Sequence, residues 1–325
     1  MAGVASVKVA PEARGRGIGR QLMTELLARI AARGYPLSAL YPATMPIYRS
    51  LGWELAGSRY HAVIPARSLR DLLPADKAIK ALTPNETGAP GLRKVTPGDA
   101  ASVISALGHA HEAARDCGPA TRDLAWMTDR ISHGGEYAYV GGDAFLSYEW
   151  QPGSHDLFVG WAVAASVASQ RELWSVLAGY SSIVHSVTVR TSPDNPIWWL
   201  LRERDAQLVK RSMWMLRVVD VKAAIEGRGF GTAVVGSVRL NLADDARPQN
   251  AGTWELAVSG GTATLERAEA DAGALTLGAR GLAALYGGTP MATLRLAGLA
   301  TGGTAEDDEF LSAAFGCTSF MLDVF

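Results

Sequence analysis

The sequence has little cysteine and no recognisable pattern of metal ligands. Only two of its 325 residues are cysteines, Cys117 and Cys317, and they lie two hundred residues apart. Neither belongs to a CxxC or Cys/His spacing, and the six histidines share no metal-ligand spacing. The sequence therefore predicts neither a disulfide framework nor a metal site, and it fits a reduced, cytoplasmic compartment.

Long apolar runs and an excess of one charge are also missing. The longest apolar stretch, residues 160–168, is followed by Gln170, Arg171 and Glu172, and it is much shorter than the roughly 20 residues of a membrane-spanning helix. The first residues lack the charged-then-apolar order of a signal peptide. With 31 basic against 32 acidic side chains, the composition argues against a nucleic-acid binder or a membrane-surface protein. We expect a soluble protein.

What is present is enough sequence for two or three domains, and the composition changes along it. Residues 1–73 show an α/β pattern. Residues 74–91 contain three prolines with little apolar periodicity, which indicates a linker. Residues 92–220 show a second α/β pattern, and residues 221–325 are rich in Gly, Ala, Thr and Leu and contain mainly strand-like runs. The predicted fold class is therefore α/β with an α+β region at the carboxy-terminal end.

The first region has a clear order of elements. Alternation from Val4 to Val9 predicts a strand, and apolar residues four positions apart, beginning at Ile18, predict a helix that ends near Gly34. The apolar positions of that helix are Ile18, Leu22, Leu26 and Ile30. A strand over Leu37–Tyr41, a short helix over Pro46–Leu51 and two strands within Trp53–Ile64 follow.

The later regions yield further elements from the same reasoning. Predicted strands are Tyr137–Val140, Ala144–Trp150, Val184–Val189, Ser237–Leu242, Gly252–Ser259 and Thr262–Glu266. Predicted helices are Ala100–Ala110, Arg171–Tyr180, Ala279–Tyr286, Leu294–Leu299 and Glu306–Phe315.

A glycine-rich turn leads into the first helix. Its residues are Arg14, Gly15, Arg16, Gly17, Ile18, Gly19 and Arg20, and they fit R-x-x-G-x-G. A helix amino terminus leaves N–H groups unpaired, and glycine lets the backbone close around an anion, so a pyrophosphate is a suitable ligand. Glycines at such a junction also occur for purely conformational reasons. No Gly-Lys-Ser/Thr follows and the G-x-G-x-x-G spacing is missing, which argues against nucleotide hydrolysis and hydride transfer.

The order strand, R-x-x-G-x-G, helix, strand, then Tyr48-x-x-Leu51-Gly52-Trp53 resembles the GNAT superfamily of N-acetyltransferases. In that family the motif holds the pyrophosphate of acetyl-coenzyme A. The phrases VASVKVAPEARGRGIGRQLM and LSALYPATMPIYRSLGWE are similar to the Eis (enhanced intracellular survival) family of aminoglycoside acetyltransferases, as are residues 213–221 and 287–294. This resemblance implies a catalytic GNAT domain, a degenerate GNAT-like domain and a sterol-carrier-like domain.

The resemblance also implies roles for single residues. Tyr48 corresponds to the general acid, and the α-carboxylate of the last residue, Phe325, to the general base. Main-chain groups of Val7 and Val9 would pair with the pantetheine arm, and Thr44 would lie near the cofactor. Other interpretations stay open: a buried structural tyrosine, core valines, a helix cap at Thr44 and a frayed chain end.

The resemblance implies an amine-bearing small molecule, such as an aminoglycoside, as acceptor and a hexamer as the assembly. A complete GNAT domain also has three strands and two helices ahead of Val4–Val9, without which that strand would be an exposed edge. We therefore expect the isolated chain to be less active than a form extended upstream. Two alternatives remain: a coenzyme-A-binding paralogue without activity, and a lipid-binding or scaffold protein acting through its last domain.

Overall fold

The computed structural model describes residues 1–72, 91–119 and 122–323. These residues form two compact units. Unit 1 comprises residues 1–57 and 213–319, and unit 2 comprises residues 58–212 and the segment that starts at residue 320. Unit 1 is therefore built from the two chain segments that precede and follow residues 58–212.

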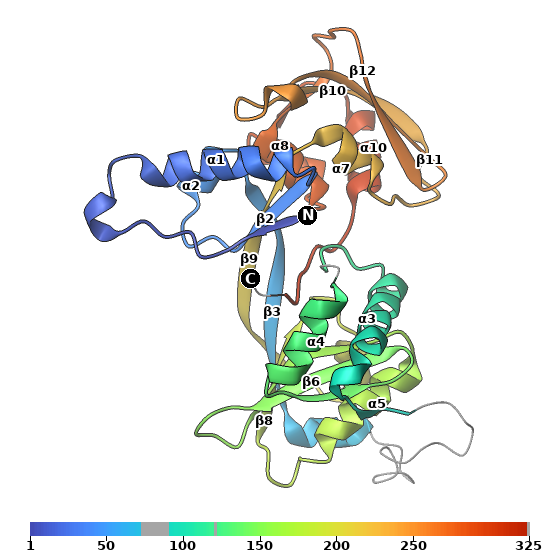
Figure 1. Ribbon diagram of the computed structural model, residues 1–325. Coiled ribbons are helices and arrows are strands. Elements are labelled where there is room, and N and C mark those ends of the chain that lie inside the picture. The colour runs from blue at the N-terminus through green and yellow to red at the C-terminus, as the bar shows by residue number, and fades with distance from the viewer. Residues whose placement is uncertain (73–90, 120–121, 324–325) are drawn as a thin grey trace. The chain divides into compact units, whose positions relative to one another are not determined.

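The first part of unit 1 is a small α/β layer (Figure 1). Strands β1 and β2 pair in parallel because α1 carries the chain from one to the other, and β9 pairs antiparallel with β2. Its elements are β1 (Ala2–Val4), η1 (Pro11–Ala13), α1 (Ile18–Ala32), β2 (Leu37–Leu40), α2 (Pro46–Arg49) and the end of β9 (Gln207–Val218).

The second part of unit 1 has a five-stranded sheet in the order β12-β11-β10-β13-β14. Alternating apolar residues of these strands pack against α7, α8 and α10 in one core. The elements are α7 (Val221–Glu226), β10 (Gly236–Ala243), η5 (Pro248–Asn250), β11 (Gly252–Ser259), β12 (Thr262–Arg267), β13 (Leu275–Gly278), α8 (Ala279–Tyr286), α9 (Met291–Leu296), β14 (Ala300–Thr301) and α10 (Ala305–Phe315).

Unit 2 has a sheet in the order β3-β8-β7-β6-β5-β4. One core packs α5 and η2 against the sheet, and a second core includes α3, α4 and Phe320. The elements are β3 (Glu54–Pro65), η2 (Ala66–Leu72), β4 (Arg93–Lys94), η4 (Pro97–Asp99), α3 (Ala100–Ala114), α4 (Leu124–His133), β5 (Tyr137–Val140), β6 (Ala144–Trp150), β7 (Leu157–Ala164), α5 (Val167–Ala178), β8 (Ser186–Thr191) and α6 (Ile197–Leu200).

The same order of elements occurs twice in the chain. The first repeat is β1-α1-β2-α2-β3, and the second is β7-α5-β8-α6-β9. In each repeat the first two strands pair in parallel across one helix. The third strand of each repeat pairs with the second strand of the other, since β3 is antiparallel to β8 and β9 is antiparallel to β2. We call β3 and β9 the exchanged strands.

Two predicted elements of the first region are wrong. The strand expected over Val4–Val9 is β1, which ends at Val4, because Ser6 has a left-handed backbone (φ 56°) that turns the chain out of the sheet. The two strands expected within Trp53–Ile64 are one strand, β3. It continues through Gly57, where a side chain would collide with the Trp214 indole and the Ser319 carbonyl.

The core-facing side of α1 also differs from the prediction. Met23, Leu27 and Ile30 are buried, whereas Leu22 is 45% exposed. In the carboxy-terminal region the helix expected over Leu294–Leu299 is α9, which starts and ends three residues earlier. The predicted strands at β5, β6 and β11 and the predicted helix at α8 match the structure residue for residue.

The three-domain division, with boundaries at 73, 91 and 220, stays a prediction, and most of the expected linker lies outside the described residues. No helix in the described ranges combines the length and the apolar character that a membrane crossing requires.

Candidate active site

The turn before α1 leaves the first amides of this helix open. Gly15 and Gly17 both have φ 76°, a conformation that favours glycine, and Gly17 is the N-cap. No side chain in the described part of the chain caps the helix. The first backbone bond of α1 runs from the Gln21 amide to the Gly17 carbonyl at 3.1 Å. The amides of residues 18–20 are therefore free to bind an anion.

The third glycine of the motif has a packing role. A Cβ atom on Gly19 would lie 3.0 Å from Cδ1 of Ile47 on α2 and 3.6 Å from Cγ2 of Val9. A side chain at this position would force the end of the Ile47 side chain to shift by a few tenths of an ångström. The motif thus combines two conformational glycines with one contact glycine.

A hollow of about 460 Å³ lies at this helix terminus. Three arginines, Arg14, Arg16 and Arg20, are exposed around the turn, and Nε of Arg14 donates to the Val9 carbonyl at 3.4 Å. The hollow is lined by Val9, Ala13, Arg14, Gly15, Gly17, Ile18, Gly19, Arg20, Pro46, Ile47 and Ser50. Open amides, positive charge and this volume fit a diphosphate-bearing ligand such as acetyl-coenzyme A.

Tyr48 lies on α2 but is not among the residues that line the hollow. Its side chain is only 6% exposed and packs in a cluster with Met23, Leu51 and Trp53. Burial raises the pKa of the Tyr48 phenol above its ordinary value, because the anionic form would lose hydration. The hydroxyl therefore keeps its proton at neutral pH.

A buried carboxylate that the sequence analysis did not single out fixes the end of α2. Glu54 is 3% exposed, and its Oε1 accepts from Arg49 Nη2 at 2.8 Å and from the Leu55 amide at 2.9 Å. Its Oε2 accepts from Arg280 Nε, near the start of α8, at 2.6 Å. Burial alone would raise the pKa of Glu54, but these hydrogen bonds outweigh it and hold the pKa below the ordinary value.

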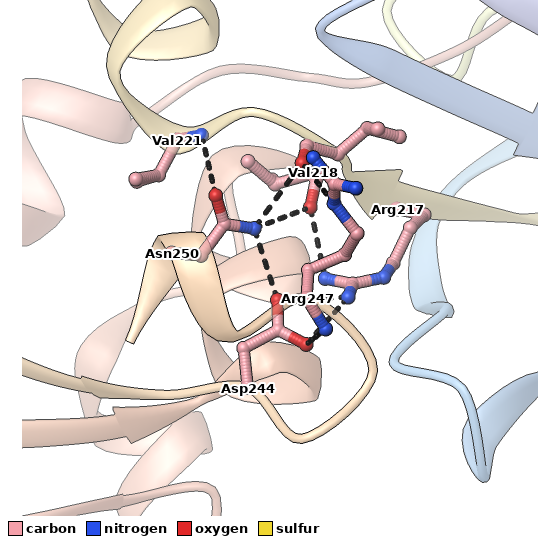
Figure 2. Close-up of polar contacts among 7 residues, drawn as sticks. Arg217, Val218, Val221, Asp244, Arg247 and Asn250 are labelled. Atoms are coloured by element: carbon pink, nitrogen blue, oxygen red, sulfur yellow. Dashed lines mark hydrogen bonds and ion pairs between the residues drawn. The ribbon is translucent and has the colours of Figure 1, made fainter. Parts of the chain in front are cut away.

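A second buried network joins β9 to the loop after β10 (Figure 2). Arg217 is fully buried and its Nη2 donates to both carboxylate oxygens of Asp244, at 2.6 and 2.8 Å. Asn250 donates to Asp244 at 3.0 Å and accepts from the Val221 amide at 3.1 Å. The Arg217 guanidinium also lies under the Gly52 turn, where a Cβ atom would be 2.9 Å from Cζ.

Other residues predicted for the site are placed outside regular elements. Val7 and Val9 follow β1 rather than belonging to it, and of the two only Val9 lines the hollow. Thr44 is exposed in the loop before α2 and does not cap that helix, since Met45 is its N-cap. Phe325 lies outside the described residues.

The segment that leads to Phe325 is held within unit 2. The Phe320 amide donates to the Cys117 carbonyl at 2.9 Å, and Phe320 forms a parallel bridge with Ser58. Asp323 is 8% exposed and forms an ion pair with Arg122. Its carbonyl accepts from Nη1 of Arg59 at 3.3 Å. Residues 320–323 are thus anchored by main-chain and ionic contacts, which an apolar sequence pattern alone does not reveal.

Among the residues that the structure describes, no three His, Cys, Asp or Glu side chains gather as they would around a metal ion.

Comparison with family models identifies three matched regions. Residues 1–56 match one acetyltransferase (GNAT) domain model, residues 118–218 match another, and residues 221–320 match a sterol carrier protein domain. The predicted α/β fold class, with GNAT domains and a sterol-carrier-like α+β domain at the carboxy-terminal end, is confirmed.

Two curated relatives match over three quarters of the chain. An uncharacterized N-acetyltransferase of Streptomyces griseus is 29% identical over 276 residues, covering 75% of this chain and 62% of its own length. The N-acetyltransferase Eis of Mycobacterium tuberculosis is 28% identical over 258 residues, covering 76% and 62%. The chain thus spans less than two thirds of the length of these relatives.

A solved structure, a GCN5-related N-acetyltransferase from Kribbella flavida, aligns with a TM-score of 0.89 and 39% identity. The alignment covers 99% of this chain and 79% of the Kribbella chain.

Proposed function

Because the chain belongs to the GCN5-related N-acetyltransferase family and resembles its Eis members, we propose that it transfers an acetyl group from acetyl-coenzyme A to a primary amine. The observation that carries this proposal is the uncapped start of α1 behind Gly17. Open amides, two left-handed glycines and three exposed arginines gather there around one hollow. That set of groups binds phosphate oxygens well and offers little to an apolar ligand.

In this proposal the residues of the motif hold the cofactor. The amides of residues 18–20 and the side chains of Arg14, Arg16 and Arg20 bind its pyrophosphate, and main-chain groups of Val7 and Val9 and the Thr44 hydroxyl bind its arm. When bound, acetyl-coenzyme A supplies an activated thioester that an amine can attack.

Two groups of this chain would manage protons. We assign the general acid to Tyr48, which holds its proton on Oη because burial raises its pKa. We assign the general base to the α-carboxylate of Phe325, which would accept the proton that the amine loses. A free α-carboxyl group has a pKa of about 3.5, so a less polar environment is needed to make it an effective base.

The acceptor, the assembly and the location follow from the resemblance alone. We expect a primary amine as acceptor, with an aminoglycoside as the class that the resemblance implies. A hexamer and a cytoplasmic location stay predictions; light scattering on the purified chain tests the first.

The proposal is tested by two measurements on the same protein. Calorimetric titration with coenzyme A reports binding, and release of free thiol from acetyl-coenzyme A in the presence of amines reports transfer. Binding together with amine-dependent thiol release supports the proposal. Binding without release supports the inactive paralogue instead, and absence of binding overturns both.

A further inference from the structure

Unit 2 contains a small cavity between α4 and the sheet. Its volume is about 60 Å³, which corresponds to about two water molecules at their volume in the liquid. The side chains that line it include Met127 and Arg130 of α4, Ser147 of β6 and Trp161 of β7. The cavity shares no residue with the hollow before α1. We call it the α4 cavity.

Two buried polar side chains line the α4 cavity without a hydrogen-bond partner. Ser147 is 1% exposed and Trp161 is 4% exposed. They lie directly opposite each other on β6 and β7, so both side chains stand on the same face of the sheet. Among the residues that the structure describes, neither Oγ of Ser147 nor Nε1 of Trp161 has a partner. Burying such a donor costs free energy unless a bound group accepts its hydrogen bond.

A carboxylate supplies a hydrogen-bond acceptor at the same cavity. Oε1 of Glu136 accepts from Nη2 of Arg130, whereas Oε2 makes no hydrogen bond within the described parts of the chain. A Cβ atom on Gly160 would lie 3.2 Å from Oγ of Ser147 and 3.9 Å from Oε2 of Glu136. Since both oxygens lie near this one point, a single small ligand can reach both of them.

The other walls of the α4 cavity are apolar or already compensated in charge. Met127 and Phe145 line it and belong to the same core as Trp161. The Arg130 guanidinium pairs with Glu136 and lies 4.4 Å from the centre of the Trp161 ring. Because this cation already has its anion, a further full charge inside the cavity would be costly. These walls suit a neutral group that has an acceptor, a donor and a small apolar part.

The α4 cavity has a solvent side and a buried side. Lys94, which also lines it, is exposed, and the side chains of Arg130 and Glu136 are 31% and 22% exposed. Ser147 and Trp161, in contrast, are buried. A ligand can therefore place a small polar group against the buried donors while the rest of the molecule extends past Lys94 into solvent.

We propose that the α4 cavity binds a carboxamide, namely the acetamide group of an N-acetylated amine. The carbonyl oxygen accepts from Nε1 of Trp161 and Oγ of Ser147, and the amide N–H donates to Oε2 of Glu136. The methyl group packs against Met127 and Phe145. Transfer of an acetyl group to a primary amine yields such a secondary amide, so the identity of this ligand as the reaction product rests on the proposed function.

The amide site is tested first without turnover and without coenzyme A. The full chain is titrated with acetamide, acetate and acetamidinium, which share one shape but are neutral, anionic and cationic. The indole N–H resonance of Trp161, assigned by its loss in Trp161→Phe, is followed by NMR. We expect a saturable shift with acetamide at millimolar concentration and about tenfold weaker binding of both ions. Equally tight binding of either ion would overturn the amide site, as would the lack of a saturable shift in a cavity that holds only water.

Trp174 is the matched internal control. Its Nε1 is also buried without a partner among the described residues, but it belongs to the core that contains α5, so its resonance should not shift. Ser147→Ala should weaken acetamide binding about fivefold and leave the melting temperature unchanged, because it removes a hydroxyl that the fold does not pair. Ser132→Ala, at an exposed position of α4, should keep the affinity. Equal affinities of these two variants would overturn the assignment.

The link to the proposed reaction is tested with N-butylacetamide and the bulkier N-butylpivalamide. We expect N-butylacetamide to compete with acetamide and to shift the Trp161 resonance, and N-butylpivalamide, whose acyl group overfills the cavity, to bind about tenfold more weakly. No binding of N-butylacetamide would overturn the product as ligand. If the chain acetylates no amine, the proposed function fails, and the acetamide titration still decides whether the amide site exists. If amines are acetylated but no amide binds, only this inference fails.

Discussion

The two repeats of the chain share one topology but begin their helices differently. In the first repeat residues 5–17 separate β1 from α1, and the N-cap is Gly17 with no capping side chain in the described part of the chain. In the second repeat only residues 165–166 separate β7 from α5, and the Ser166 hydroxyl accepts from the Ser169 amide at 3.2 Å. In the second repeat the Ser166 side chain therefore caps the helix terminus, whereas in the first repeat the helix terminus stays open to an anion.

The short helices after the second strands differ in the same sense. The first repeat has Pro46-Ile47-Tyr48, and the second has Pro196-Ile197-Trp198. A phenol can give up its proton, whereas an indole N–H cannot serve as an acid near neutral pH. The comparison teaches that the fold is common to both repeats, while the proposed chemistry depends on a few positions of the first.

The largest effect on turnover is expected from replacing Tyr48, which the second repeat lacks at the corresponding position. Tyr48→Phe keeps the buried ring but removes the proton, so thiol release should fall about 10²- to 10⁴-fold while coenzyme A binding stays unchanged. Tyr35→Phe is the control, because Tyr35 is 41% exposed. Unchanged turnover in Tyr48→Phe would remove the general-acid role.

The exchanged strands end differently, and this difference should matter for stability. The penultimate residue of β9 is Arg217, paired with Asp244, whereas that of β3 is Ile64 in an apolar core. Asp244→Ala leaves a buried guanidinium without its partner and should destabilise the fold by about 3–5 kcal/mol. Ile64→Val should cost about 1 kcal/mol. Urea unfolding of both variants measures the contrast, and equal losses would contradict it.

The first residues of the exchanged strands also differ, with Glu54 in β3 and Gln207 in β9. Because the folded-state pKa of Glu54 is lowered, its stabilisation is present above the ordinary carboxyl pKa and is lost as pH falls through the folded value. Glu54→Gln should lower stability at pH 7 by about 2–3 kcal/mol and flatten the acid side of the stability profile. If Glu54→Gln has the same stability as the unaltered chain at every pH from 7 to 3, Glu54 does not contribute to the stability of the fold.

A methyl group added at the turn before α1 tests whether this turn, which differs between the two repeats, binds the cofactor. Gly17→Ala strains a backbone at φ 76°, and it should weaken coenzyme A binding about tenfold. Gly34→Ala imposes the same strain at φ 74°, beyond the other end of α1, with open space around both positions. If the two variants bind coenzyme A equally well, the turn before α1 is not the cofactor site.

The smallest effect is expected in the second repeat. Ser166→Ala removes the cap of α5 and should lower stability by about 1 kcal/mol. It should leave coenzyme A affinity unchanged, because we assign no cofactor to this helix. A change in affinity on calorimetric titration would mean that the second repeat also binds the cofactor.

Local sequence signals predicted much of the fold. The alternation of β11 and the periodicity of α8 gave the observed bounds, because both elements bury one face against a single core. The buried side of α1 was not predicted, since three of its four four-residue-spaced apolar positions are not buried. Periodicity shows that a helix is amphipathic, but neighbouring elements decide which residues are covered.

The residues of the candidate site likewise fall into those that the sequence could reveal and those that it could not. The Arg14–Arg20 turn could be found because its residues are adjacent in sequence. Glu54 with Arg280, and Arg217 with Asp244, could not be found, because each pair is created by folding between distant segments. A single sequence contains the charges but not their pairing, and it does not reveal that Gly57 lies against Trp214 and Ser319 within β3.

The exchange of third strands has a consequence for biosynthesis. Strand β2 is made early, yet its antiparallel neighbour β9, whose Arg217 pairs with Ser38, is the last strand of the second repeat to be translated. Closing so long a loop is slow, and one edge of β2 stays unpaired during translation until β9 has been synthesised. The unpaired edge of β2 therefore has to be protected from other strands until β9 leaves the ribosome. Stalling translation before residue 218 should leave this edge open to non-native pairing.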